Sequence, residues 1–120
     1  MADRDPTYQA DCLFCKIAAG EIPSDRVLED EAVIVFRDIN PKAPTHVLAI
    51  PRRHLASAAD LTDADGDLLA ALFNALRRVA HEAGLSGYRI ISNVGAESGQ
   101  SVFHLHFHLL GGRSMSWPPG

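Results

Sequence analysis

Three histidines near the end of the chain, His104, His106 and His108, alternate with large apolar residues in the run Phe-His-Leu-His-Phe-His-Leu-Leu over 103–110. In an extended strand, side chains two residues apart share a face and stand about 6.6 Å apart. A neutral imidazole nitrogen attacks phosphorus well, and imidazoles exchange protons near pH 7. A solvated strand face explains a single histidine more simply, but three in strict alternation favour a nucleophilic site.

A small polar loop, residues 93–101, comes just before this histidine row. Gly95, Gly99, Gln100 and Ser101 offer backbone N–H groups and a hydroxyl that suit a phosphate. Gly-Gln-Ser is equally typical of an ordinary turn, so the loop alone is weak evidence. The chain has no G-x-x-x-x-G-K-[ST] and no G-x-G-x-x-G motif, and nucleotide sites of those types are not supported.

The only two cysteines, Cys12 and Cys15, form a Cys-x-x-Cys pair. This spacing suits a metal half-site, a redox dithiol or two buried apolar thiols. A redox site would be expected beside a thioredoxin-like βαβ pattern, which the sequence lacks. A structural zinc needs two further ligands; His54 is a plausible third, and one end of the histidine row could supply the fourth. The spacing slightly favours the metal site and leaves the alternatives open.

Two further polar residues, Asp38 and His46, are predicted to end one strand and begin the next. Both could therefore lie at the rim of a shared pocket. On the residues alone, a surface turn is the safer interpretation for each.

Apolar periodicity predicts the elements that position these side chains. Strands grouped around one long helix indicate an α+β domain with an antiparallel sheet. We expect a loose tail over 1–10, a short helix over 12–19, strands over 26–29, 32–37, 46–51, 88–92 and 102–110, and a long helix from 62 or 63 to 84.

Composition limits the classes of partner. The chain has 120 residues, of which 47% are hydrophobic, and a formal net charge of −4, which together predict one domain. The mild acidity argues against a nucleic-acid partner. No apolar run approaches the ~18 residues of a membrane span, and the polar N-terminus has no apolar signal core. We therefore expect a soluble, cytoplasmic protein that does not bind membranes.

The residues of the histidine row match the pattern His-φ-His-φ-His-φ-φ, where φ is hydrophobic, and the chain thereby resembles the histidine triad (HIT) family. The stretches 36–41, 43–46, 50–54 and 99–104 and the terminal Trp-Pro-Pro-Gly resemble its Hint branch. The similarity covers residues 11–120, a single domain that includes the C-terminal tail. It implies a five-stranded antiparallel sheet with one long and one short helix. It also implies a homodimer that continues the sheet, with each tail reaching toward the partner's active site.

The resemblance implies a phosphoramidase that hydrolyses adenosine or guanosine 5′-monophosphoramidates and related acyl-nucleotides. By position, His106 resembles the nucleophile that forms a nucleotidyl-histidine intermediate. His108 resembles the phosphate-contacting partner, and His46 resembles an orienter or proton relay. Ser101 and Asn93 match positions that contact the phosphate and the leaving group.

The same resemblance implies a nucleotide site for AMP or GMP. Asp38 matches the ribose-binding carboxylate. The remaining expected contacts comprise an apolar slot around the base together with two residues of the phosphate loop; they are Phe14, Ile22, Phe36, Ile39, Gln100 and Val102.

The Cys-x-x-Cys pair resembles that of many bacterial members of the family. This resemblance implies a structural zinc held by Cys12, Cys15, His54 and His104. Two alternatives stay open for the activity. A dinucleoside polyphosphate hydrolase belongs to a neighbouring branch, and the tail argues against it. A nucleotide-binding regulatory protein with little turnover is the other, although all three histidines and Ser101 are present.

Overall fold

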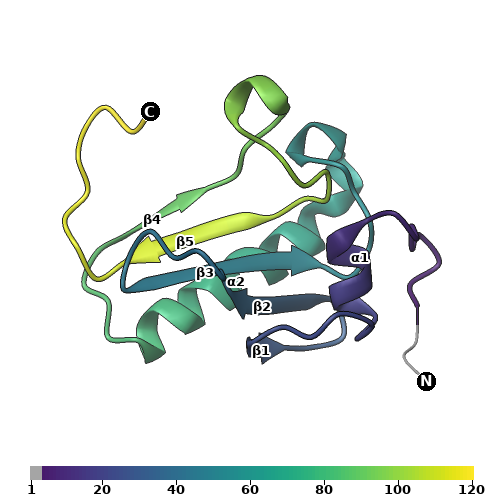
Figure 1. Ribbon diagram of the computed structural model, residues 1–120, viewed down its shortest axis with the longest axis horizontal. Helices are drawn as coiled ribbons and strands as arrows, with labels where there is room; N and C mark the ends of the chain where they lie inside the picture. The colour runs from purple at the N-terminus through teal and green to yellow at the C-terminus, as the bar shows by residue number, and fades with distance from the viewer. Residues whose placement is uncertain (1–3) are drawn as a thin grey trace.

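The computed structural model describes residues 4–120 and contains one five-stranded antiparallel sheet in the order β1-β2-β3-β5-β4 (Figure 1). This architecture agrees with the α+β fold expected from the sequence. The strands are β1 Arg26–Glu29, β2 Val33–Arg37, β3 Thr45–Pro51, β4 Tyr88–Ile91 and β5 Phe107–Gly111. The α-helices are α1 Leu13–Ala18 and α2 Gly66–Glu82, and short 3₁₀ turns cover Ala58–Asp60, Asp63–Asp65 and Ala96–Ser98.

The sheet separates two apolar clusters, one against each helix. Strand β2 shows the alternation: Val33 and Val35 pack on the α2 side, whereas Ile34 and Phe36 pack on the α1 side. Helix α2 runs along one face of the sheet, and α1 covers one end of the opposite face (Figure 1). A strand residue therefore reaches either the main core or the α1 face, depending on the parity of its position.

Helix α2 begins later than the sequence predicted, at Gly66 rather than at residue 62 or 63. The Asp65 carboxylate accepts hydrogen bonds from the backbone N–H of Thr62 at 2.9 Å and from Arg53 at 2.6 Å, which holds residues 63–65 in a 3₁₀ turn. The helix ends at Glu82, two residues before the predicted end at Gly84. Gly84, with a φ of 70°, closes the last turn as the N–H of Leu85 donates to the carbonyl of Ala80. Within residues 4–120, no helix combines the length and the apolar character needed to cross a membrane.

The last strand is shorter than the predicted 102–110, because β5 begins only at Phe107. His104 and His106 precede the strand, since this part of the chain bonds the segment after β3: the N–H of Leu105 donates to the carbonyl of Leu55 at 2.6 Å. The predicted alternation nevertheless persists. Leu105, Phe107 and Leu109 belong to the main core. The other strands and α1 agree with the predicted bounds to within one residue at each end.

The first described residues are tied to the domain, whereas the sequence predicted a loose tail over 1–10, of which 1–3 lie outside the described residues. Arg4 forms a 3.0 Å ion pair with Glu21, and its guanidinium lies 4.3 Å from the ring centre of Tyr8. The Thr7 hydroxyl oxygen accepts a 2.6 Å hydrogen bond from the backbone N–H of His54. These contacts attach residues 4–8 beside α1.

Candidate functional site

The His106 ring is held in one tautomer by the backbone. Its Nδ1 lies 2.7 Å from the carbonyl oxygen of His104, and because a carbonyl only accepts, Nδ1 carries the hydrogen and Nε2 keeps its lone pair. The ring meets Phe14 edge to face, with centroids 5.1 Å apart. Burial lowers the pKa of His106, so the ring stays neutral at pH 7. Nε2 is therefore available as a nucleophile.

A second pair of imidazoles, His46 and His108, forms a hydrogen-bonded chain. The backbone N–H of Lys42 donates to Nδ1 of His46 at 3.0 Å, which places the His46 hydrogen on Nε2. That Nε2 lies 2.9 Å from Nδ1 of His108, so His46 donates and the His108 hydrogen is on Nε2. Burial lowers the pKa of His46 and lowers that of His108 to about 4. Both rings are neutral at pH 7, and His108 is an N–H donor.

The ligand atoms of Asp38, His46 and His108 lie within 4.8 Å of one another, close enough to consider a metal ion. A metal on Nε2 of His46 would require the hydrogen on Nδ1, where the N–H of Lys42 already donates. Two donors would then face each other, which is unfavourable. The Asp38 carboxylate, 3.4 Å from Nε2 of His46, instead stabilises positive charge on that ring. The cluster thus suits proton movement better than metal binding.

His106 and His108 line a cleft of about 370 Å³ on the α1 face. The cleft is apolar at α1 and the neighbouring strands, and polar around the histidines and the 93–101 loop. Nine of the predicted nucleotide contacts line it: Phe14, Phe36, Asp38, Ile39, Asn93, Ser101, Val102, His106 and His108.

Two predicted nucleotide contacts, Ile22 and Gln100, do not line the cleft. Ile22 packs at the margin of the α1-side cluster, and Ile17 is the isoleucine of α1 that borders the cleft. Gln100 is buried and braces the loop: its amide nitrogen donates to the carbonyl of Ala56 at 2.7 Å, and its oxygen accepts from the N–H of Gly95 at 2.8 Å. His46 lies behind His108 rather than at the cleft wall.

Three apolar residues of the cleft, Leu13, Ile17 and Leu48, were missed by the sequence reasoning. Ile17 lies four residues after Leu13 and three residues after the predicted Phe14 on α1, so it is a neighbour of both on the helix surface. Leu48 lies on β3 with the same parity as His46, which points to the α1 face. Helix spacing and strand parity were thus the signals that would have found them.

The four predicted metal ligands, Cys12, Cys15, His54 and His104, come together with all ligand atoms within 4.8 Å. Cys12 Sγ and Cys15 Sγ lie 3.3 Å from Nδ1 of His104 and of His54, respectively, and the two Nδ1 atoms are 3.2 Å apart. A tetrahedral zinc places such atoms about 3.3–3.8 Å apart. Nε2 of His104 donates to the Pro51 carbonyl at 2.8 Å, which leaves its Nδ1 lone pair for a metal. The residues present therefore fit a zinc ion.

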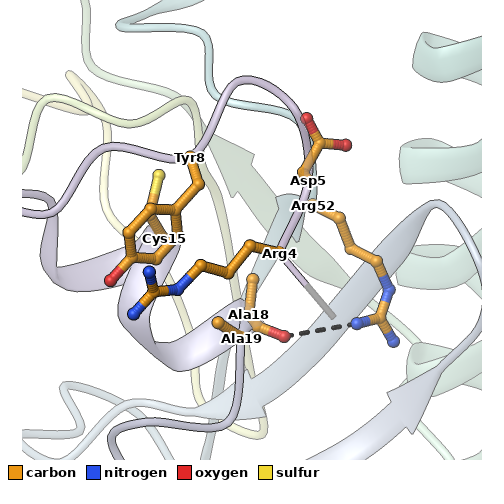
Figure 2. Close-up of a pocket in the computed structure, with 7 residues that line it drawn as sticks. All are labelled: Arg4, Asp5, Tyr8, Cys15, Ala18, Ala19 and Arg52. Carbon is orange, nitrogen blue, oxygen red and sulfur yellow. Dashed lines mark hydrogen bonds between the residues drawn. The ribbon is translucent and has the colours of Figure 1, made fainter. Parts of the chain in front are cut away.

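The backbone at the start of α1 also positions the two thiols. Cys12 is the N-cap of α1, and its sulfur accepts the backbone N–H of Cys15 at 3.3 Å. Burial raises the pKa of the Cys15 thiol to about 11, and a bound dication would supply the charge that favours its ionised form. Cys15 also lines a hollow of about 300 Å³ between α1, the N-terminal segment and Arg52 (Figure 2).

Comparison with known proteins finds a family model that covers nearly the whole chain. Residues 11–117 match the model described as scavenger mRNA decapping enzyme C-term binding. A HIT-like protein of Synechococcus elongatus is 46% identical over 111 residues, which are 92% of this chain and 97% of the relative. The 14 kDa zinc-binding protein of Zea mays is 49% identical over 111 residues, covering 90% and 87% of the two chains.

Solved structures with the same fold include two HIT family hydrolases. That of Legionella pneumophila has a TM-score of 0.90 at 53% identity, and the match covers 92% of this chain and all of the other. That of Clostridium thermocellum has a TM-score of 0.87 at 45% identity, with 90% and 96% coverage. A histidine triad nucleotide-binding protein of Candida albicans has a TM-score of 0.78 at 34% identity, with 90% and 83% coverage.

Proposed function

The chain belongs to the HIT family, and from this premise we propose that it is a purine nucleoside phosphoramidase of the Hint branch. It would hydrolyse adenosine or guanosine 5′-monophosphoramidates and related acyl-nucleotides. The observation that carries the proposal is the 2.7 Å contact between Nδ1 of His106 and the His104 carbonyl, because it leaves Nε2 unprotonated in a cleft of nucleotide size. The names of the related hydrolases support the class of reaction.

The reaction would proceed in two displacements at the α-phosphorus. Nε2 of His106 forms a bond to phosphorus as the bond to the amine nitrogen breaks. The amine takes a proton that the His46–His108 pair has first bound from solvent, with the Asp38 carboxylate stabilising the charged ring. An amine is a poor leaving group unless protonated, so this acid is essential. Water then attacks the nucleotidyl-histidine, returns one proton to the imidazoles and releases AMP or GMP. The chain of His46 and His108 supports this role, since it links an N–H donor in the cleft to a second ring.

The remaining parts of the substrate would occupy the two ends of the cleft. The purine would lie among the apolar side chains of α1 and the strands, which include Phe14 and Ile17. Asp38 would accept hydrogen bonds from the ribose hydroxyls; its Oδ1 is oriented by the N–H of Asn40 at 2.8 Å. Ser101 and Asn93 would contact the phosphate and the amine. Cys12, Cys15, His54 and His104 would hold one structural zinc.

We further propose a cytoplasmic homodimer. Strand β4 lies at the edge of the sheet, where its free side can pair with a second copy. The tail passes beside β4, where Arg89 donates to the Ser116 carbonyl at 2.9 Å, and it leaves 83% of Trp117 exposed. A tail reaching the partner's cleft would cover this ring. Two buried free cysteines suit a reducing compartment.

A second candidate activity is hydrolysis of dinucleoside polyphosphates, which the decapping description of the matching family model favours. A nucleotide-binding protein with little turnover is the third, which the name of the Candida albicans structure favours.

The test is hydrolysis of adenosine 5′-monophosphoramidate by the wild type, by His106→Ala and by His81→Ala, a matched control on α2. We expect the His106 variant to lose at least a thousandfold in kcat/KM and the control to match the wild type. Mass spectrometry of rapidly quenched wild type should find an AMP adduct on His106. Faster cleavage of diadenosine polyphosphate would favour the second activity. Equally slow turnover by all three proteins, with AMP still bound, would refute the proposed enzymatic activity and favour the nucleotide-binding protein.

A further inference from the structure

A groove of about 310 Å³ lies next to the catalytic cleft, on the other side of the 101–102 segment. Three residues, Leu13, Ser101 and Val102, line both the cleft and the groove, so the two hollows are adjacent. The other lining residues come from the N-terminal segment, from the metal cluster and from the residue after Val102; they are Gln9, Asp11, Cys12, His54 and Phe103. The proposed function assigns nothing to this groove.

We propose that the groove is the leaving-group subsite, and that it selects amines whose apolar chain ends in a second ammonium group. The proposal rests on the proposed phosphoramidase activity and names the class of amine that this site accepts. Three features of the groove support this assignment: its position relative to the nucleophile, its apolar walls and the carboxylate of Asp11.

Position is the first feature. In an in-line displacement the leaving group departs from the side of phosphorus opposite the nucleophile, so its chain must extend away from Nε2 of His106. The groove is lined by neither His106 nor His108, yet it begins at Ser101, which also borders the cleft. A phosphate held between His106 and Ser101 therefore directs the departing amine past Ser101 into the groove.

The apolar walls are the second feature. Leu13 and Phe103 are large apolar residues that expose 44% and 51% of their surface, and both border the groove. A methylene chain laid between them would be removed from water, which favours binding by up to about fourfold for each buried CH₂ group.

Charge is the third feature. Asp11 is an exposed residue of the groove, and among residues 4–120 its carboxylate has no hydrogen-bond or ion-pair partner. A carboxylate in this position attracts an ammonium group and repels an anion. The leaving group of a dinucleoside polyphosphate is an anionic nucleotide, whereas that of a phosphoramidate is an amine. Asp11 therefore also favours the phosphoramidase over the polyphosphate hydrolase.

The test compares three AMP phosphoramidates made from ethylamine, hexylamine and 1,6-diaminohexane. The proteins are the wild type, Asp11→Asn and Asp67→Asn, a control with the same charge change on α2. We expect the wild type to prefer the diamine over hexylamine by about two- to fivefold in kcat/KM, as for an exposed ion pair. The preference should disappear in Asp11→Asn, persist in Asp67→Asn and weaken at 0.5 M salt.

Phe103→Ala tests the walls independently of charge. The wild type should prefer hexylamine over ethylamine by about tenfold, since the chain is only partly buried, and this variant should lose most of that preference. If the wild type, Asp11→Asn and Phe103→Ala all show the same relative kcat/KM for the three substrates, the proposed subsite is overturned while the phosphoramidase activity stands. Failure of the wild type to hydrolyse any of the three would overturn both proposals.

Discussion

Nδ1 of His106 and the carbonyl oxygen of His104 lie 2.7 Å apart, so the backbone of one triad histidine fixes the tautomer of the next. The His104 side chain contributes its own Nδ1 to the metal cluster and anchors its Nε2–H on Pro51. A single residue therefore joins the candidate metal cluster to the proposed nucleophile. The Phe14 ring makes an edge-to-face contact with each of the two imidazoles, with ring centroids 6.0 Å from His104 and 5.1 Å from His106.

Loss of the metal should therefore affect both stability and turnover. We expect purified wild type to hold about one zinc per chain. Cys15→Ser should lose it and destabilise the fold by several kcal/mol, because the three remaining ligands, two of them buried, are left without a cation. The residual folded protein should show a lower kcat with a similar KM, since only the orientation of His106 changes. Elemental analysis, thermal unfolding and steady-state kinetics measure these effects.

His104→Ala and His106→Ala separate the two roles. The first should lower Tm at least as much as Cys15→Ser, and the second should abolish turnover while leaving Tm close to that of wild type. A Cys15→Ser variant with unchanged Tm, or a wild type that copurifies without zinc, would contradict the structural metal.

Acid should destabilise the fold through His108. Burial holds the pKa of His108 at about 4, against an ordinary value near 6.5 in the unfolded chain. Between these values the unfolded chain binds more protons, so stability falls as pH decreases. The contribution of neutral His108 is complete above pH ~6.5 and is lost as pH falls through about 4. Thermal unfolding between pH 8 and pH 4 should show this slope.

His108→Gln should flatten the slope, and His81→Gln, which changes an exposed histidine on α2, should retain it. Both variants keep the metal cluster, so release of metal in acid affects them equally and cancels in the comparison. Equal slopes for His108→Gln and the wild type would show that His108 does not carry the effect.

Gln100 should prove structural rather than ligand-binding. Its amide nitrogen donates to the carbonyls of Ala56 and Val102, and both distances are within 3.1 Å. Gln100→Glu keeps the shape but places a buried acceptor against two carbonyls, so we expect a loss of about 3 kcal/mol. Thermal unfolding measures it, with Asn74→Asp on α2 as the matched amide-to-acid control. A variant as stable as that control would argue that Gln100 has other partners.

Much of the architecture could be predicted because the relevant signals are local. Strand β1 has the predicted bounds, and the alternation of Leu105 and Phe107 with the histidines places their side chains on opposite faces. The metal set was predicted from a resemblance, and the structure brings its four residues together. The hydrogen bond from the Leu105 N–H to the Leu55 carbonyl, because of which β5 begins only at Phe107, joins residues that are 50 positions apart. No local sequence pattern predicts such a bond.

The direction of the hydrogen bonds could not be predicted from the sequence either. The tautomer of His46 depends on the backbone N–H of Lys42, and that of His106 depends on a carbonyl two residues earlier. Neither donor nor acceptor is encoded by a side-chain type, so residue patterns could name the histidines but could not assign which nitrogen reacts. The role of Gln100 was missed for the same reason, because its three partners are all backbone groups.

Asp38 should determine the preference for ribose. Wild type should hydrolyse the 2′,3′-dideoxy analogue of adenosine phosphoramidate at least about 100-fold more slowly in kcat/KM, because the analogue loses two hydrogen bonds to a charged group, each worth about 1.5–3 kcal/mol. Asp38→Asn should bring the ratio of kcat/KM for the two substrates close to one.

The Asp38 carboxylate also lies 3.4 Å from Nε2 of His46, so the variant should slow both substrates through the imidazole chain. That loss is common to both and cancels in the ratio, which isolates the ribose contact. The Asn40 N–H can still bond the amide oxygen, so the loop should keep its shape. A variant that discriminates between the two sugars as strongly as wild type would show that another residue binds the hydroxyls.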